Sequence, residues 1–293
     1  MRSFSHYMTE LFGGRVQKIA VDGGFTCPNR DGTVGRGGCT YCDNRAFVPS
    51  YCHRTDSVTK QLQAGKQFFA SKGDVVGYLA YFQAFTGTHD DVSRLEARFE
   101  EALTVDGVLG LVIATRPDCL PGNVLDYIAD LQRRAYVMVE LGVETMHDRT
   151  LQLVNRCHDC ATSVDAIERL AACRIPVGVH LILGMPGETV ADMELTVDAI
   201  SALPVSMVKF HQMQVLKGTL LAQQVTARQV AVQRWTAQEY AAVCARLLRR
   251  LPSDMVVERV VAQSPSGMVL LPQWGLKPAE FQTILEKEIE QYN

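Results

Sequence analysis

The sequence predicts a single α/β domain built as a partial, TIM-like (βα)6 barrel with a C-terminal strand and helix. Short apolar, β-branched runs alternate six times with segments of helical periodicity. The chain has 293 residues, a length at which such a barrel folds as one unit. Its residues are 47% hydrophobic and 21% charged, which is typical of a globular protein that buries a large core.

Each predicted strand is a short apolar run of the kind that is buried on both faces of a parallel sheet. The six runs are Lys18–Val21, Val76–Phe82, Gly107–Ala114, Val137–Leu141, Val177–Leu183 and Val205–His211.

A segment with helical spacing of its apolar residues follows each run. These segments are Thr59–Ala70, Asp91–Leu103, Asn123–Arg133, Ser163–Cys173, Val190–Leu203 and Thr236–Leu251. Because βαβ crossovers are right-handed, the series predicts a parallel sheet that curves into a barrel. Six units are two short of a closed barrel, so we expect a lateral opening.

The end of the chain predicts one more strand, Asp254–Val260, and a terminal helix, Pro278–Tyr292. We expect both to cover the bottom or side of the barrel. No low-complexity linker marks a second domain. We therefore expect one domain over residues 1–293, with a core of about 16–251 and an extension of about 252–293.

Charge and hydropathy restrict the location and the partners. The N-terminal residues contain no apolar signal segment and no run of eighteen apolar residues follows, so we expect a cytoplasmic protein without a membrane partner. A net charge of −3 gives no overall attraction to nucleic acid. Basic residues do gather between Arg15 and Lys66, where they either form a solvated surface or contact RNA locally.

Three of the nine cysteines lie on the loop after the first predicted strand, with the spacing C-x11-C-x2-C at Cys27, Cys39 and Cys42. Three thiolates on one loop can ligate an iron–sulfur cluster, and six glycines between Asp22 and Asn44 let the backbone approach it closely. A four-cysteine zinc site that includes Cys52 is the alternative on spacing alone. The position at the C-terminal end of a barrel strand favours the cluster.

The loop resembles that of radical S-adenosylmethionine (SAM) proteins, in which an aromatic residue precedes the third cysteine, as Tyr41 does here. The long first gap resembles the small bacterial branch that is related to the catalytic subunit of Elongator and lacks an acetyltransferase domain. The resemblance implies a partial barrel of the radical SAM type and a [4Fe–4S] cluster on the three cysteines. It also implies that SAM binds the fourth iron and is reductively cleaved to a 5′-deoxyadenosyl radical.

Polar and small residues at the predicted strand ends match the SAM-binding positions of these proteins. The resemblance implies that Arg156 binds the SAM carboxylate, although Cys157 stands where relatives usually have Gly. It also implies that small residues after the fifth strand admit the adenine. The complete predicted SAM set is Tyr41, Gln83, Thr86, Gly87, Thr115, Arg116, Glu140, Arg156, His180, Ile182, Gly184, Gly187 and Glu188.

Further polar residues are candidates for substrate contact or catalysis, namely Asp118, Glu144, His158, Lys209 and His211. By the Elongator resemblance we expect tRNA as substrate, with processing of a carboxymethylaminomethyl group on the wobble uridine. A small metabolite is the alternative substrate, and a zinc-binding protein without catalysis is a third reading. We expect an electron donor such as flavodoxin or ferredoxin.

Overall fold

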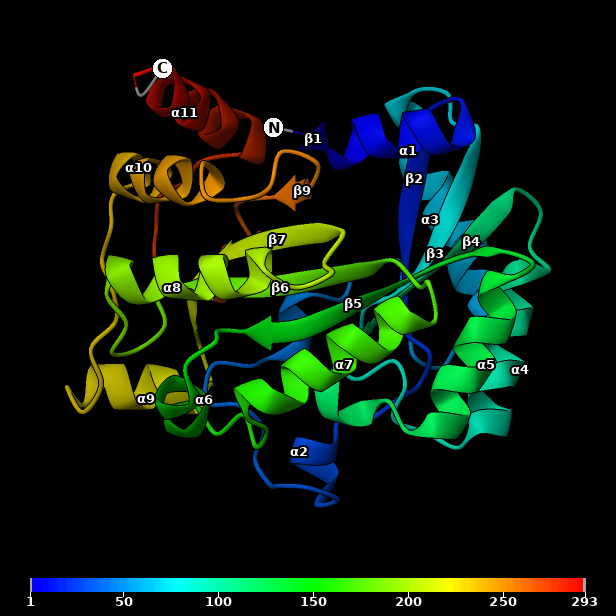
Figure 1. The fold of residues 1–293 in the computed structure, drawn as a ribbon, viewed down its shortest axis with the longest axis horizontal. Helices are drawn as coiled ribbons and strands as arrows, with labels where there is room; N and C mark the ends of the chain where they lie inside the picture. The colour runs from blue at the N-terminus through cyan, green and yellow to red at the C-terminus, as the bar shows by residue number, and fades with distance from the viewer. Residues whose placement is uncertain (1, 292–293) are drawn as a thin grey trace.

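The computed structural model describes residues 2–291, in which one curved sheet carries helices on its outer face (Figure 1). The sheet has eight parallel strands in the order β1-β9-β7-β6-β5-β4-β3-β2. These strands are β1 (Arg2–Ser3), β2 (Val16–Val21), β3 (Gly77–Phe82), β4 (Val108–Thr115), β5 (Tyr136–Glu144), β6 (Val177–Leu183), β7 (Met207–Gln212) and β9 (Val256–Arg259). A separate antiparallel pair consists of β8 (Val215–Leu216) and β10 (Val269–Leu271).

Helices connect successive strands, as right-handed crossovers require. The outer layer consists of α3 (Val58–Phe69), α4 (Val92–Leu103), α5 (Gly122–Gln132), α7 (Cys160–Ala172) and α8 (Val190–Ser201). The other helices are α1 (Phe4–Phe12), α2 (Pro28–Asp31), α6 (Asp148–Leu153), α9 (Leu220–Thr226), α10 (Ala237–Leu248) and α11 (Pro278–Glu290). None of the helices between residues 2 and 291 is long and apolar enough to span a bilayer.

The predicted partial α/β barrel is confirmed, and the six predicted strand–helix units are present with bounds shifted by a few residues. The predicted position of the last strand is wrong. Instead of covering the bottom or side, β9 enters the sheet between β7 and β1, because Val256 and Val257 are buried there. The predicted terminal helix is α11; its predicted last residue, Tyr292, lies outside the described residues.

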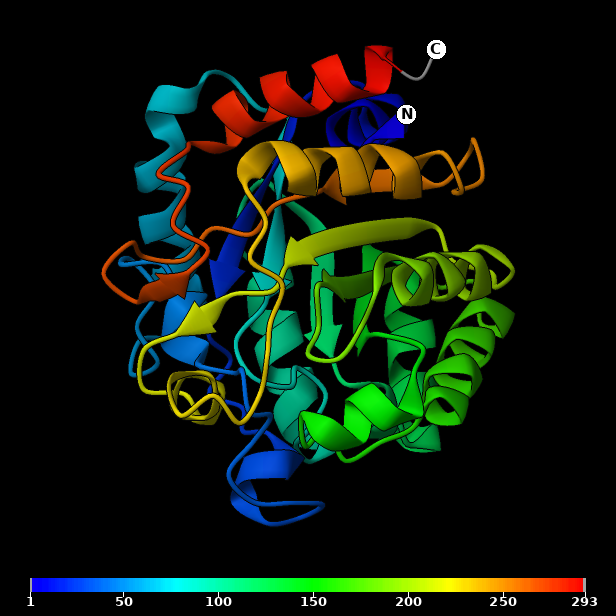
Figure 2. The ribbon, with the colours of Figure 1, turned by 90° about the vertical axis from the view of Figure 1, so that its left-hand side faces the viewer.

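The sheet does not close, because β1 and β2 form its two edges. Helix α1 connects these edges and buries Met8 completely against the inner face of the sheet. Gly13 ends the helix with a φ of 75°, a left-handed conformation that glycine adopts without strain. The N-terminal residues therefore cover one end of the barrel interior, and the opposite end remains for the cysteine loop (Figure 2).

Side chains alternate along each strand, so the barrel interior is layered. The layer next to α1 is apolar and includes Leu79, Val112, Met138 and Met207. Two residues further along the strands come Lys18, Tyr81, Glu140 and Lys209, which form a buried polar layer. Two residues further again, the side chains line a cavity at the C-terminal ends of the strands.

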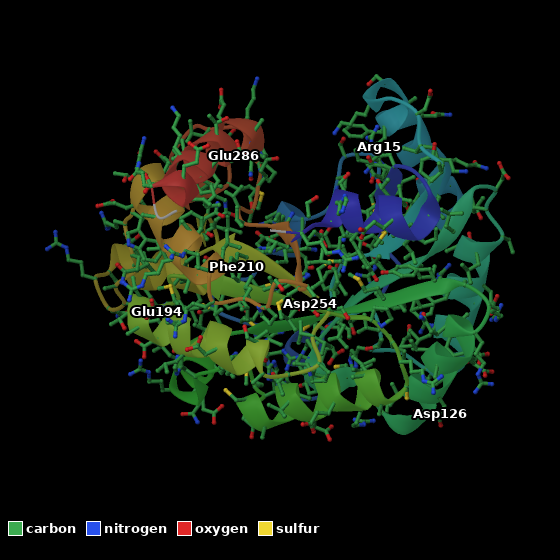
Figure 3. All side chains as sticks on the ribbon, turned by 45° about the horizontal axis from the view of Figure 1, so that its top comes forward. Arg15, Asp126, Glu194, Phe210, Asp254 and Glu286 are labelled. Atoms are coloured by element: carbon green, nitrogen blue, oxygen red, sulfur yellow. The ribbon has the colours of Figure 1, made fainter. Side chains whose placement is uncertain are left out.

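The outer face of the sheet forms the largest apolar core with the helices. Phe210 of β7 is completely buried in it, whereas Asp126 of α5 and Glu286 of α11 are exposed (Figure 3). The extension continues this core, since Phe281 of α11 stacks on Trp274 with ring centroids 5.8 Å apart. Tyr240 of α10 joins the same cluster and donates a hydrogen bond to the Val260 carbonyl at 2.7 Å.

Candidate active site

The cysteine loop lies over the C-terminal ends of the strands, where the chain leaves β2. Its short helix α2 and the glycine-rich turn after it project from the molecule (Figure 2). Cys39 is buried and Cys27 and Cys42 are half-buried. All three line the same cavity, which extends into the barrel between the strand ends.

Hydrogen-bond donors surround the thiols. The side-chain amide of Asn29 lies 3.7 Å from the Cys39 sulfur, and that of Asn44 lies 3.8 Å from the Cys42 sulfur. Arg156 Nη1 lies 3.6 Å from the Cys39 sulfur. Burial, with Cys39 nearby, raises the pKa of Cys42 to about 11, so this thiol ionises at neutral pH only when a cation or metal replaces its proton.

The rest of the cavity comes from the ends of β3 to β7. Of the predicted site residues, those that line it are Cys27, Cys39, Tyr41, Cys42, Gln83, Thr86, Thr115, Arg116, Glu140, Glu144, Arg156, His180, Ile182 and His211. Segments distant in sequence thus converge at the edge where parallel barrels carry their chemistry.

Buried polar atoms without hydrogen-bond partners in the cavity wall show whether the cavity fits a polar cofactor. The Tyr41 hydroxyl, Thr86 Oγ1 and Arg116 Nη1 are buried and have no hydrogen-bond partner. They make up three of the six such side-chain atoms within residues 2–291, and all three residues line this cavity. Buried polar groups are normally paired. Donors without acceptors beside three thiols therefore fit an iron–sulfur cluster and a ligand that carries carboxylate and hydroxyl groups.

Arg116 and Arg156 are buried side by side on the cavity wall, since Arg116 Nη2 donates to the Arg156 carbonyl at 2.9 Å. Asp118 accepts from Arg116 at 2.7 and 2.8 Å, and His158 accepts from Arg156 Nε at 3.0 Å. Burial and then Arg156 lower the pKa of His158 to about 4, so its imidazole is neutral. Asp118 and His158 hold the two guanidinium groups and do not themselves line the cavity.

Side chains alternate at the end of β5, with Glu140 and Glu144 facing the cavity and Leu141 in the outer core. Glu144 Oε1 lies 3.3 Å from Arg156 Nη2. Both oxygens of Glu140 already have partners, because Oε1 accepts from Lys18 at 2.7 Å and Oε2 accepts from three groups. Those three donors are Tyr81 at 2.7 Å, His180 at 2.8 Å and Lys209 at 2.8 Å.

Five further residues that were predicted to belong to the site do not line the cavity. Their contacts are with other parts of the protein. Gly87 packs against β4, where a Cβ would lie 2.7 Å from the Ala114 carbonyl oxygen. Gly184 and Gly187 take left-handed conformations in the turn after β6. The buried Glu188 carboxyl accepts a hydrogen bond from Thr145 at 2.6 Å. Lys209 belongs to the buried polar layer beneath the cavity.

The remaining cysteines do not join the three on the loop. The buried Cys52 thiol donates to Gln61 Oε1 at 2.8 Å and does not line the cavity that the other three thiols share, which speaks against a four-cysteine zinc site. Within residues 2–291, no three Cys, His, Asp or Glu side chains are placed to hold a single metal ion. Cys157 donates to Asn29 Oδ1 at 3.2 Å, and Cys160 is the first residue of α7.

Sequence reasoning missed several cavity or loop residues, among them two asparagines of the cysteine loop and Phe85. Asn29 is fully buried and connects the loop to the segment after α6, donating to the Asn155 carbonyl at 2.5 Å. Asn44 accepts from the Phe85 amide at 2.9 Å, and Phe85 lines the cavity. The only sequence signal was the position of both asparagines two residues after a cysteine, which by itself also fits a turn.

Comparisons with known proteins agree with this geometry. Residues 29–200 match the Radical SAM superfamily, and residues 205–291 match the Radical SAM C-terminal domain. The chain is 38% identical over 288 residues to "Uncharacterized protein YtqA" of Bacillus subtilis (strain 168), covering 98% of this chain and 89% of that protein.

Two more distant similarities concern Methanocaldococcus infernus. The structure of its archaeal Elp3 with an N-terminal deletion superimposes with a TM-score of 0.69 at 17% identity, covering 94% of this chain and 63% of that one. Its tRNA uridine(34) acetyltransferase is 29% identical over 116 residues, covering 39% of this chain and 21% of that protein. The superfamily match includes more than half of the chain. The chain is therefore a member of the radical SAM superfamily, whose enzymes use a [4Fe–4S] cluster and SAM.

Proposed function

We propose that this radical SAM enzyme acts on tRNA and processes the carboxymethylaminomethyl side chain of a wobble uridine. The observation that carries the proposal is the likeness over 116 residues to a tRNA uridine(34) acetyltransferase. The proposed electron donor is a flavodoxin or a ferredoxin.

The rim of the cavity supports an RNA substrate. Arg30 lines the cavity, and the exposed Arg45 reaches the loop after β8, where Gly218 follows the exposed Lys217. These three cations come from two separate segments and lie beside the strand ends. Phosphate groups of RNA are bound by such cations in spite of an overall net charge of −3.

The residues of the site have separate tasks in the proposed reaction. Cys27, Cys39 and Cys42 would hold the cluster, while Arg116 and Arg156 would bind the SAM carboxylate through their planar N–H groups. When bound, the cluster and SAM supply a primary carbon radical that takes a hydrogen atom from a C–H bond of the substrate. The cysteine loop above the cavity, and the buried polar and apolar layers that follow one another below it, exclude water from that position.

The test is an anaerobic assay of the reconstituted protein with SAM, dithionite and bulk tRNA, in which 5′-deoxyadenosine is quantified and the tRNA nucleosides are analysed by mass. We expect 5′-deoxyadenosine to increase with tRNA, and carboxymethylaminomethyluridine to be lost. Cys39→Ala serves as the control and should give neither product. Formation of 5′-deoxyadenosine without any change in the tRNA would contradict the proposed substrate and favour a small metabolite.

A further inference from the structure

Four charged side chains that are largely buried form a square directly below the cavity. Lys18 Nζ lies 2.7 Å from Glu140 Oε1 and 2.7 Å from Glu258 Oε2. Lys209 Nζ lies 2.8 Å from Glu140 Oε2 and 2.9 Å from Glu258 Oε1. Each ammonium group thus contacts both carboxylates, and the four charges cancel.

Arg259 lies next to this square, and its positive charge is not one of the four that cancel. It is the last residue of β9 and is paired in register with Lys209. Its Nη2 donates to His211 Nε2 at 2.9 Å, and its Nε is buried without a partner. No carboxylate in the described part of the chain forms an ion pair with Arg259. Among these five residues, the positive charges therefore exceed the negative ones by one.

His211 connects Arg259 to the cavity, because its side chain is part of the cavity wall. Since Nε2 accepts from Arg259, the ring proton must be on Nδ1, and Nδ1 has no hydrogen-bond partner within residues 2–291. The imidazole is neutral, because burial and the Arg259 charge hold its pKa well below the usual range. The wall thus offers N–H donors and a positive charge without an acceptor.

We propose that Arg259 and His211 bind an anionic oxygen group of the substrate, either a carboxylate or a phosphate. The buried Nε of Arg259 has no hydrogen-bond partner, and a guanidinium group binds either anion through parallel N–H groups. Arg259 does not itself line the cavity, but it is half-buried and donates to His211, which does, so a ligand at the His211 wall lies next to its guanidinium group. The inference rests on the proposed function, since tRNA offers both a side-chain carboxylate on the modified uridine and backbone phosphates.

The first experiment needs no RNA. Binding of N-acetylglycinate, its neutral analogue N-acetylglycinamide and inorganic phosphate to the reconstituted, SAM-bound protein is measured by calorimetry. The wild type should bind at least one of the two anions at least about tenfold more tightly than the amide, and Arg259→Gln should lose this preference. Equal binding of anions and amide by the wild type, or an unchanged preference in the variant, would overturn the proposal.

Arg134→Gln is the matched control for the lost charge. Arg134 is exposed, forms an ion pair with Glu100 and precedes β5, at the opposite end of the strands from the cavity. This variant should keep the anion preference. If Arg259→Gln does not fold, Arg259→Lys replaces it; the lysine keeps the charge but lacks the planar fork, and it should bind the anion more weakly than the wild type.

The second experiment identifies the source of the anion. Binding of tRNA with carboxymethylaminomethyluridine is compared with binding of the same tRNA with aminomethyluridine, which has the same phosphates and no carboxylate. If the side-chain carboxylate is bound, Arg259→Gln weakens binding of the first RNA only; if a phosphate is bound, it weakens both equally. An unchanged affinity for both would overturn the proposal. Should the wild type modify no tRNA, the proposed function fails while the probe titration still decides on the anion site.

Discussion

At the scale of single residues, the site combines groups that the sequence displays with groups that only the fold brings together. The three cysteines and Tyr41 could be predicted as a group because they are close together along the chain and follow a predicted strand. The partners of Glu140 could not, since Lys18 is 122 positions away and the contact depends on strand order. The unpaired atoms of Thr86 and Arg116 are likewise invisible in a sequence, because pairing is a property of the packed molecule.

Replacement of Cys39 should abolish cluster binding, whereas replacement of Cys52 should not. Cys39 faces the cavity, while the Cys52 thiol is turned towards Gln61. After anaerobic reconstitution, Cys39→Ala should lose most of its iron and sulfide, and Cys52→Ala should retain both with a stability loss of about 1 kcal/mol. Iron and sulfide analysis and the visible spectrum measure the difference. Loss of iron from Cys52→Ala would make that residue a cluster ligand after all.

Glu140→Gln should lower the free energy of unfolding by about 3–5 kcal/mol, because it leaves the buried Lys18 and Lys209 with one carboxylate instead of two. Denaturant titration measures the change. The exposed Glu286 offers a control, and Glu286→Gln should stay within about 0.5 kcal/mol of the wild type. An equal effect of both substitutions would mean that the buried square contributes nothing.

The Glu140 carboxyl should also make the stability of the protein sensitive to acid. Burial would raise the pKa of Glu140, but Lys18 and Lys209 outweigh it and hold the pKa well below the usual range. A depressed folded pKa contributes stability above the unfolded value of about 4.3 and loses it as the pH falls towards the folded pKa. The wild type should therefore lose stability below about pH 4.3 more steeply than Glu140→Gln. Parallel pH profiles would contradict this.

At the scale of elements, hydrophobic patterning predicted the strands well, because strands buried on both faces are continuous apolar runs. β6 spans Val177–Leu183 in both the prediction and the structure. The two-residue strand β1 was missed, since Arg2 and Ser3 carry no apolar pattern and pair with β9 only through their backbone. The place of β9 inside the sheet was missed for a related reason, because patterning identifies a strand but not its neighbours.

Replacement of Gly65 in α3 by alanine should lower the stability of the protein, which is the opposite of what helix propensity predicts. Alanine is normally more favourable than glycine within a helix. A Cβ on Gly65 would, however, lie 2.2 Å from Ile19 Cγ2 of β2, so Gly65→Ala should destabilise the protein by about 1–3 kcal/mol. Gly122 begins α5, and a Cβ added there would meet no atom within 4 Å, so Gly122→Ala should stabilise by about 0.4–1 kcal/mol. Thermal unfolding of both variants checks the opposite signs.

At the scale of the whole molecule, the two family matches divide the chain between residues 200 and 205, whereas the sheet crosses that division. Strands β7 and β9 come from the C-terminal part and pair with β6 and β1 of the N-terminal part. The charged square depends on both parts, since Lys18 and Glu140 meet Lys209 and Glu258. We therefore expect the described residues to fold as one cooperative unit.

Truncation tests this expectation. A chain of residues 1–204 loses β7 and β9, which exposes one side of β6 and leaves Glu140 without Lys209, so it should not fold. A chain of residues 1–276 loses only α11 and should keep the barrel at lower stability, because Trp274 and Tyr240 lose their contact with Phe281. Far- and near-UV circular dichroism during unfolding measures both. The full chain should show a single coincident transition, and a folded 1–204 fragment would establish two independent domains instead.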